Sequence, residues 1–330
     1  MRRILLASAL VLALMGCASN EPGPTSGSAE GRQDFKVALL TPGPVNDSGW
    51  SALAYEGLLA IRDELGAEIS NQEAKGTQIR DAMRSYAQRG FRLVFGHGFE
   101  YNEPGVEIAK DFPDTVFVSS SGGKTAKNAG AFRFYLEQGF YLAGVMAADL
   151  SKSGVVAMIG GPKVPSIEST FKAFEAGAKA ERPDIRVLTL FTGQDSDVAA
   201  AKRATLEAIA QGADLVIHQA NAAAQGVFEA CREKGVLAIG SNANQNENES
   251  GVVVASAVIV AKPAFVELAK DVRDGRYEGS IRLVGMDKGA IDFVINPKLE
   301  SRVPEATRKK LDDLRAKILS GALVVPKDEF

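Results

Sequence analysis

The amino-acid sequence predicts an α/β fold of two Rossmann-like, doubly wound lobes joined by a three-crossover hinge. Short apolar runs alternate with longer stretches of helical periodicity from Phe35 onward, as in the βαβ units that build a parallel sheet. The alternation restarts near Gly154 and completes a second set of the same kind. Two such sets predict two similar lobes instead of one large sheet, with the cleft between them as the expected ligand site.

The first set of elements ends near residue 118. Its first two helices are stopped by Gly66 and Gly90, because glycine readily adopts the left-handed conformation that ends a helix. Strands are expected over residues 36–41, 67–70, 91–95 and 115–118, and helices over residues 51–65, 78–89 and 103–111.

The second set repeats this order, and a less regular tail follows it. The second set predicts strands over residues 154–159, 185–191, 214–218 and 236–240, with helices over 166–180 and 196–211 and a third that ends at 234. The tail predicts a strand over 252–257, a helix over 262–274, a strand over 291–295 and a helix over 305–319.

The tail determines the expected hinge. Its first strand and helix follow a completed second set and have no place left there, so the chain is expected to return to the first lobe. Crossovers are expected near residues 120–134, 245–252 and 278–290. The first lobe then comprises residues 34–125 and 250–280, and the second comprises 126–249 and 281–330.

The N-terminal segment is built like an export signal. Arg2 and Arg3 precede a short apolar run that ends in the residues LMGC at Cys17, and the run is too short to cross a bilayer comfortably. A Cys in that place resembles the lipobox of bacterial lipoproteins, in which the thiol receives a lipid. Residues 1–16 are therefore expected to be a signal peptide and 17–33 a flexible tether outside the cytoplasm, although an ordinary cleaved signal is the alternative.

Charge and cysteine content exclude several classes of protein. The formal net charge is −3 and no basic block occurs, which argues against a nucleic-acid partner. If Cys17 carries a lipid, Cys231 is the only other cysteine, so no intramolecular disulfide can form. Cys231 lies in a helical pattern and is expected to be a small buried hydrophobic residue.

The loop after the first strand, residues 42–50, contains the first predicted ligand-binding residues: Asn46, Asp47 and Trp50. The loop lacks the spaced glycines of a dinucleotide fingerprint and the Lys-Ser/Thr of a phosphate loop. Asp47 or Ser48 alternatively caps the following helix. Trp50 is the only Trp and offers a flat surface with one N–H donor, unless it belongs to the core.

Polar and aromatic residues follow the later strands too, where parallel sheets place their functional loops. Phe99 follows the third strand and Ser120 the fourth, while Asn221 and Asn242 follow two strands of the second lobe. We predict that these four residues bind ligand. The alternative is that they only form turns.

Catalytic and metal-binding patterns are absent from the sequence. His97 and His218 fall in different lobes, and neither has a Cys, His or carboxylate at metal-ligand spacing. No Gly-x-Ser-x-Gly motif occurs, and Cys231 has no nucleophile signature. We therefore expect no metal, no cofactor and no enzymatic turnover, and predict that the protein binds its ligand unchanged.

Five stretches spread over nearly the whole chain after the tether have a recognisable pattern: residues 45–58 (VNDSGWSALAYEGL), 141–148 (YLAGVMAA), 174–178 (FEAGA), 235–245 (GVLAIGSNANQ) and 284–290 (VGMDKGA). In this order they resemble the basic membrane protein (BMP) family of substrate-binding lipoproteins of ABC importers. This resemblance implies the type I periplasmic-binding-protein fold, an extracytoplasmic site at the membrane, and permease and ATPase partners for a monomeric receptor. Members of the family include purine-nucleoside receptors, and Trp50 matches the aromatic residue of their first lobe.

The chain departs from the nucleoside-binding members at two places. An acidic motif is replaced here by Asn242-Ala243-Asn244, and an expected second-lobe aromatic by Gln194-Asp195. Asn242 still offers a hydrogen bond, but without the charge that strengthens such contacts. The ligand is therefore expected to be a purine base, a nucleoside or another small heteroaromatic molecule. A non-transporting surface sensor or adhesin, and a cleft enzyme, are the alternative functions.

Overall fold

The computed structural model describes residues 35–47 and 49–329. Within these residues no helix is both long and apolar enough to span a membrane. The expected signal peptide (1–16), the lipid site at Cys17 and the tether (17–33) lie outside the described residues and stay predictions.

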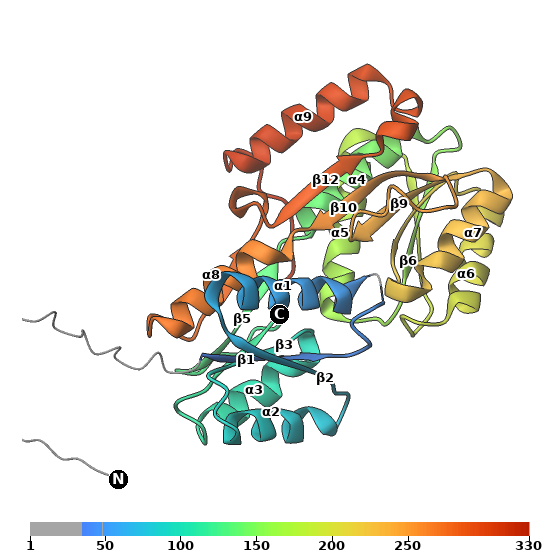
Figure 1. Cartoon of the computed structure of the whole chain (residues 1–330). Coiled ribbons are helices and arrows are strands. Elements are labelled where there is room, and N and C mark those ends of the chain that lie inside the picture. The colour runs from blue at the N-terminus through green and yellow to red at the C-terminus, as the bar shows by residue number, and fades with distance from the viewer. Residues whose placement is uncertain (1–34, 48, 330) are drawn as a thin grey trace, which may run out of the picture. The chain divides into compact units, whose positions relative to one another are not determined.

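The first lobe is a parallel sheet covered by helices on both faces, with strand order β11-β5-β4-β3-β1-β2. The face with Val37 and Leu39 packs against α1 and α8, and the face with Ala38 and Leu40 packs against α2 and α3 (Figure 1). Its strands are β1 (Lys36–Thr41), β2 (Glu68–Glu73), β3 (Leu93–Gly96), β4 (Val116–Ser119), β5 (Ala129–Phe134) and β11 (Ile281–Val284). Its helices are α1 (Trp50–Leu65), α2 (Gln78–Gln88), α3 (Asn102–Ala109) and α8 (Ala261–Arg273).

The second lobe repeats this plan with strand order β12-β10-β9-β8-β6-β7, in which only the pairing of β12 with β10 is antiparallel. The face with Val156 and Met158 packs against α4 and α5, and the face with Ala157 and Ile159 packs against α6 and α7. Its strands are β6 (Val155–Gly160), β7 (Arg186–Phe191), β8 (Leu215–Gln219), β9 (Leu237–Asn242), β10 (Val253–Ile259) and β12 (Ile291–Ile295). Its helices are α4 (Glu137–Leu150), α5 (Pro165–Glu181), α6 (Val198–Ala210), α7 (Ala224–Lys234) and α9 (Glu305–Leu319).

The predicted fold class of two doubly wound lobes is confirmed, and most predicted elements lie within a few residues of their observed bounds. Cys231 is fully buried in α7, as expected. The buried thiol is inert at neutral pH because burial raises its pKa to about 12.

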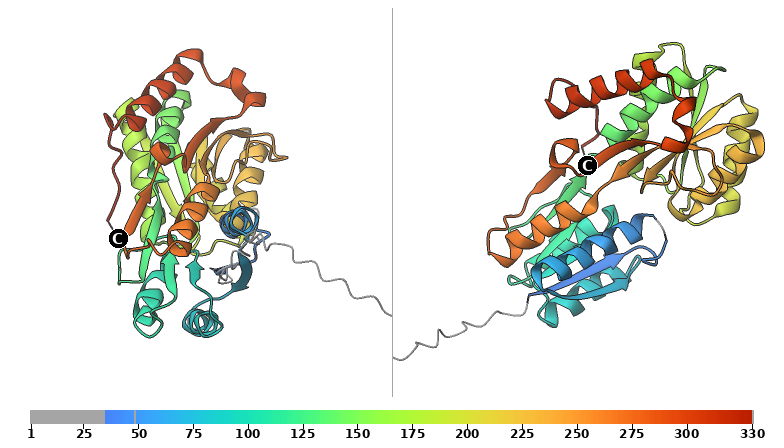
Figure 2. Two further views of the ribbon diagram at one scale, coloured as in Figure 1. Left: turned by 60° about the vertical axis from the view of Figure 1, so that its left-hand side comes forward. Right: turned by 45° about the horizontal axis from the view of Figure 1, so that its top comes forward.

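The expected lobe boundaries differ from the structure at three strands. β10 belongs to the second sheet, so residues 250–259 are not part of the first lobe, while α8 packs on α1 (Figure 2). β5 and β11 belong to the first sheet, although they were expected in the second lobe. The second crossover therefore lies at about residue 260 instead of 245–252. The first lies just after Phe134, at the end of the expected range, and the third follows Val284, inside its expected range.

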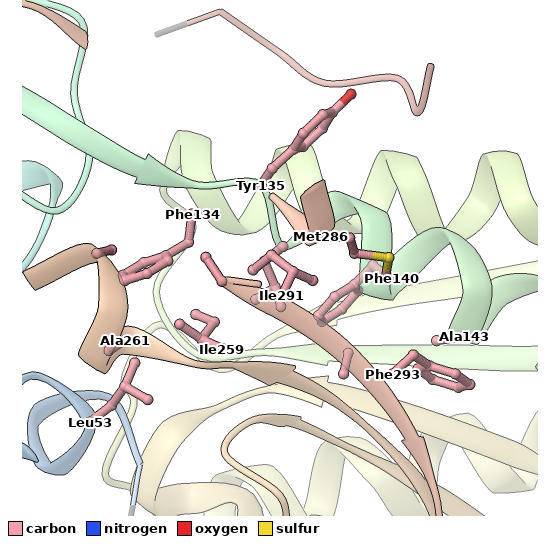
Figure 3. Close-up of a cluster of buried hydrophobic side chains, with 14 of the residues drawn as sticks. Leu53, Phe134, Tyr135, Phe140, Ala143, Ile259, Ala261, Met286, Ile291 and Phe293 are labelled. Carbon is pink, nitrogen blue, oxygen red and sulfur yellow. The ribbon is translucent and has the colours of Figure 1, made fainter. Parts of the chain in front are cut away.

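The three crossovers share one hydrophobic cluster. Phe134 and Tyr135 come from the first crossover, Ile259 and Ala261 flank the second, and Met286 follows the third, and all are buried (Figure 3). The same cluster includes Leu39 of the first lobe and Met158 of the second, so the hinge is part of a hydrophobic core that is continuous between the lobes.

A very close helix contact supports the second lobe beside this hinge. A Cβ atom placed on Gly144 of α4 would lie 2.0 Å from the backbone oxygen of Phe174, and one on Gly177 of α5 would lie 2.1 Å from that of Tyr141. Both distances are far below van der Waals contact, so the two helices touch backbone to backbone because these positions are glycine.

Candidate ligand-binding site

A cavity of about 360 Å³ lies where residues of both lobes and of the hinge meet, which is within the size range of small-molecule sites. Most of the exposed wall area is apolar, but 11 of the 21 lining residues carry polar or charged side chains. The lining residues of the first lobe are Pro42, Trp50, Gly98, Phe99, Glu100, Ser120 and Ser121. Arg133, Phe134, Leu136, Glu137 and Ile259 come from the hinge, and Pro162, Val164, Ser166, Ile167, Thr170, Asp195, Gln219, Asn221 and Asn242 from the second lobe.

Five of the seven predicted ligand-binding residues line this cavity: Trp50, Phe99, Ser120, Asn221 and Asn242. They meet because each lies at or just after the carboxyl end of a parallel strand, and those ends face the cleft in both lobes. Asn46 and Asp47 are not among the lining residues, and Asn46 is exposed.

Asp47 instead caps helix α1, which was the alternative considered for it. Its carboxylate accepts hydrogen bonds from the backbone N–H groups of Gly49, Ser51 and Ala52, each at 2.9 Å. Burial tends to raise the pKa of this carboxyl, but these three bonds and one from Asn221 outweigh it and hold the pKa below its ordinary value. Asp47 therefore fixes the start of the helix that carries Trp50.

Trp50 is held on one face by an imidazole. Its indole stacks on the ring of His97 with centroids 3.8 Å apart and planes 22° apart. The indole Nε1–H also donates to the backbone oxygen of His97 at 3.1 Å. Because the side chain is partly buried and lines the cavity, Trp50 is a pre-oriented flat surface and not an ordinary core residue.

His97 is the buried support beneath this indole. Its side chain is 0% exposed. Its Nε2 lies 2.8 Å from the backbone oxygen of Trp50 and its Nδ1 lies 2.7 Å from the Oγ of Ser120. Burial lowers the pKa of His97 to about 3, against smaller opposite effects of the Trp50 carbonyl and the Asp47 charge. The imidazole is therefore neutral at physiological pH.

Asn221 links the two lobes at the rim of the cavity. It begins a short 3₁₀ helix after β8 with a φ angle of 46°, which asparagine tolerates better than most residues. Its Oδ1 accepts a hydrogen bond from the backbone N–H of Trp50, and its Nδ2 donates to Asp47. The predicted ligand-binding residue thus also binds the first turn of α1.

An ion pair at the hinge lines the back of the cavity. Arg133, near the end of β5, pairs with Glu137 at the start of α4, and both side chains are almost fully buried. The Oγ of Ser169 donates to Glu137 at 2.5 Å, and the backbone oxygen of Asp328 accepts from Arg133. The pair spans the first crossover, so it holds strand and helix together where the chain changes lobe.

Two carboxylates from opposite lobes also line the cavity. Glu100 comes from the first lobe and Asp195 from the second. Although Glu100 as a whole is exposed, desolvation of its carboxyl raises its pKa, and the negative charge of Asp195 acts in the same direction. Phe99, which is 38% exposed, lies beside them.

Asn242 and Gln219 form a polar pair on the second lobe. The amide Nδ2 of Asn242 donates to Oε1 of Gln219 at 3.3 Å. The carbonyl oxygen of Asn242 and the amide nitrogen of Gln219 thus keep hydrogen-bonding capacity at the cavity wall.

Sequence reasoning missed Arg133, Glu137 and the role of His97. Arg133 lies in the segment that was expected to be only a crossover (120–134), and Glu137 lies in a stretch for which no element was predicted, so no strand end pointed to either residue. The segment after Gly96 does contain both Gly98 and His97 beside Phe99, and a histidine between two glycines after a buried strand is the signal that marks this position. Within residues 35–47 and 49–329, no group of three or more His, Cys, Asp or Glu is placed to hold a metal ion.

Solved structures with this fold include an ABC transporter solute-binding protein from Aeropyrum pernix. The two structures agree with a TM-score of 0.80 at 19% sequence identity, over 89% of this chain and 94% of that one. At this identity the agreement supports the fold and no more.

Three curated relatives match almost the full length of the chain. A purine-binding protein of Brucella abortus is 27% identical over 90% of this chain and 84% of its own. The nucleoside-binding protein BmpA of an ABC transporter of Lactococcus lactis is 27% identical over 98% of this chain and 99% of its own. The transcriptional activator protein med of Bacillus subtilis is 28% identical over 88% of this chain and 89% of its own.

The family itself is settled by a family model. That model, described as ABC transporter substrate-binding protein PnrA-like, matches residues 35–329, which is nearly all of the described part of the chain. The match agrees with the resemblance of the five sequence stretches, and the chain therefore belongs to the Bmp family of ABC transporter substrate-binding proteins.

Proposed function

We propose that this substrate-binding protein captures a purine base or nucleoside, or a similar small heteroaromatic molecule, and delivers it unchanged to an ABC permease and its ATPase. The observation that carries the proposal is the cavity between the lobes, in which the pre-oriented indole of Trp50 and the ring of Phe99 accompany polar groups from both lobes. A flat ligand between the lobes contacts both, so binding favours the closed arrangement that a permease recognises. Two relatives whose names specify a purine or nucleoside ligand support this ligand class.

The charges around the cavity favour an uncharged ligand over a phosphorylated one. Its lining contains three carboxylates, Glu100, Glu137 and Asp195, and one cation, Arg133, which is already paired. A phosphate in a partly desolvated site of this charge would be repelled. Nucleosides and bases are therefore the proposed ligands, and nucleotides are not.

The test is to identify and titrate the ligand. The purified chain is examined by mass spectrometry for a co-purified ligand, and purine bases, adenosine, inosine, guanosine and AMP are titrated in while the fluorescence of the single Trp is followed. We expect a base or nucleoside to change the emission and AMP to bind at least tenfold more weakly than adenosine. Failure of every base and nucleoside to bind would contradict the proposed ligand class.

We also propose that the protein is a monomer held outside the cytoplasm by a lipid on Cys17. The export-like segment and the Cys at its end support this proposal. The chain is expected to fractionate with membranes and to incorporate labelled palmitate, and a Cys17→Ala variant is expected to do neither. A wild-type chain that incorporates no palmitate would favour the ordinary cleaved signal.

A non-transporting sensor is the second candidate, because one relative of similar identity is named a transcriptional activator. Ligand uptake by cells with and without the gene separates the two: transport predicts loss of uptake on deletion, and sensing predicts unchanged uptake. A cleft enzyme is tested in the same material, because a ligand recovered chemically changed after long incubation would contradict binding without turnover.

A further inference from the structure

The hydrogen-bond partners of the buried His97 determine which of its two ring nitrogens carries the hydrogen. Its Nε2 lies 2.8 Å from the backbone oxygen of Trp50, and a carbonyl oxygen only accepts hydrogen bonds. The hydrogen must therefore be on Nε2. Because the ring is neutral, its Nδ1 carries a lone pair and is an acceptor.

This arrangement determines the direction of the next hydrogen bond. The Oγ of Ser120 lies 2.7 Å from Nδ1 of His97, and only the hydroxyl of Ser120 has a hydrogen to donate. The Ser120 hydroxyl therefore donates its only hydrogen to Nδ1 of His97. The two lone pairs of the Ser120 oxygen are left, so toward any other partner the hydroxyl accepts and does not donate.

Ser120 lines the cavity and is only 3% exposed. A ligand group that meets its oxygen without donating leaves two acceptors facing each other, away from water. Such unpaired buried polar groups are the physical basis of strong discrimination between ligands.

We propose that Ser120 is a specificity-determining residue that selects ligands with an N–H or O–H donor at this point of the cavity. The inference rests on the proposed function, and it narrows the ligand to a purine or nucleoside whose donor group faces Ser120. Two other lining residues offer acceptors to such a ligand as well, namely the carboxylate of Asp195 and the carbonyl oxygen of Asn242.

The binding experiment combines donor-deleted ligands with the Ser120→Ala variant. Adenosine, inosine and guanosine are titrated into the full-length chain, and the tightest binder is compared with derivatives in which one N–H is methylated or one ribose hydroxyl is removed. We expect one derivative to bind the wild type about tenfold more weakly than its parent. Ser120→Ala is expected to bind parent and derivative equally, which is the coupling that identifies a direct partner.

Controls separate this role from a structural one. Ser70→Ala removes a hydroxyl from β2, where it contacts Tyr86 and does not line the cavity, and it is expected to keep the full discrimination. If no donor deletion is coupled to Ser120→Ala, or if Ser70→Ala changes the discrimination equally, the proposal is wrong.

A measurement without ligand tests the hydrogen-bond direction itself. Nitrogen NMR of the two histidines is expected to show a proton on Nε2 of His97, and only the Nδ1 signal of that ring is expected to change strongly in Ser120→Ala. A proton on Nδ1 would overturn the proposal, because Ser120 would then be free to donate. If no purine base or nucleoside binds, the proposed ligand class fails, and this measurement still decides the direction of the Ser120–His97 hydrogen bond separately.

Discussion

The side chain of Asn221 in the second lobe binds the first turn of α1 through the backbone N–H of Trp50, at 2.8 Å. Its amide nitrogen donates to Asp47, the cap of the same helix, at 3.1 Å. The fit is tight, because a Cβ atom on Gly49 would lie 2.2 Å from the Asn221 Oδ1. The two lobes are thus joined by direct hydrogen bonds next to the cavity, and the helix they join carries Trp50.

These bonds predict that Asn221 contributes to affinity by holding the lobes together. Asn221→Gly removes both bonds and accepts the φ angle of 46° without strain. Two lost hydrogen bonds correspond to roughly 1–2 kcal/mol, so affinity for the best purine ligand is expected to fall about tenfold, mainly through faster dissociation. Stopped-flow kinetics and calorimetry measure this.

The control for that variant is Asn248→Gly, which removes an amide that donates to Gln225 of the same lobe. It is expected to leave ligand affinity unchanged. Small-angle scattering of the ligand-free protein adds an independent readout, because Asn221→Gly is expected to be more expanded than wild type. Equal dissociation rates in wild type and Asn221→Gly would show that the bonds do not hold the lobes in solution.

Trp50 is expected to be the largest single contributor to affinity. Its indole is oriented by stacking on His97 and by the bond from Nε1. Stacking of a flat ligand on an aromatic ring is worth on the order of 1–3 kcal/mol, so Trp50→Ala is expected to lose about tenfold or more in affinity. Trp50→Phe keeps a ring but loses the hydrogen bond from Nε1, so its affinity is expected to lie between those of wild type and Trp50→Ala.

Calorimetry measures these affinities, since the variants lack the fluorescent indole, and circular dichroism confirms that they fold. Wild-type affinity in a folded Trp50→Ala variant would place the ligand away from the indole, and the argument for a stacked ring would then fail.

The sequence predicted the alternation of elements well, but it did not predict α4. Twelve of the 14 residues of α4 are buried, so the helix is apolar nearly all round and carries no amphipathic period from which to recognise it. β5 precedes it and contains a Gly and an Arg, so its sequence did not indicate a strand and was expected to be an irregular crossover. Because Arg133 and Glu137 belong to these two elements, the hinge side of the cavity could not be anticipated.

The strand-end residues of the cavity could be predicted, because strand direction alone brings Trp50, Ser120 and Asn242 to one cleft. The contacts that each of these residues makes in the cavity could not be predicted. The capping role of Asp47 is a local one that the sequence offered as an alternative, whereas the hydrogen bond of Ser120 to His97 and that of Asn221 to Asp47 join side chains from different elements that are far apart in the sequence.

The two buried histidines predict a loss of stability in mild acid. Burial lowers the pKa of His97 to about 3 and that of His218 to about 4, whereas both are near 6.5 in the unfolded chain. Between these values the unfolded chain binds more protons than the folded one, so the free energy of unfolding falls as the pH is lowered from about 6.5 toward 4 and below.

His218→Gln isolates one of these contributions. The variant keeps a neutral polar side chain. Between pH 7 and pH 4.5 its free energy of unfolding is expected to decrease by on the order of 2 kcal/mol less than that of wild type. Urea denaturation at the two pH values measures the difference. Parallel stability curves for wild type and variant would mean that His218 is protonated in the folded state as well.

The Arg133–Glu137 pair is expected to be essential to stability although a surface pair of the same spacing is not. Both side chains of the pair are at most 6% exposed, so Glu137→Gln leaves the guanidinium buried beside a neutral amide, and removing one partner of a buried pair typically costs about 3–5 kcal/mol. The matched control is Glu175→Gln, whose partner Lys179 is also four residues away but about half exposed, and it is expected to cost at most about 0.5 kcal/mol. Chemical denaturation measures both changes. Because Arg133 and Glu137 come from β5 and α4 on either side of the first crossover, a small cost for Glu137→Gln would mean that the crossover is held by its hydrophobic cluster alone.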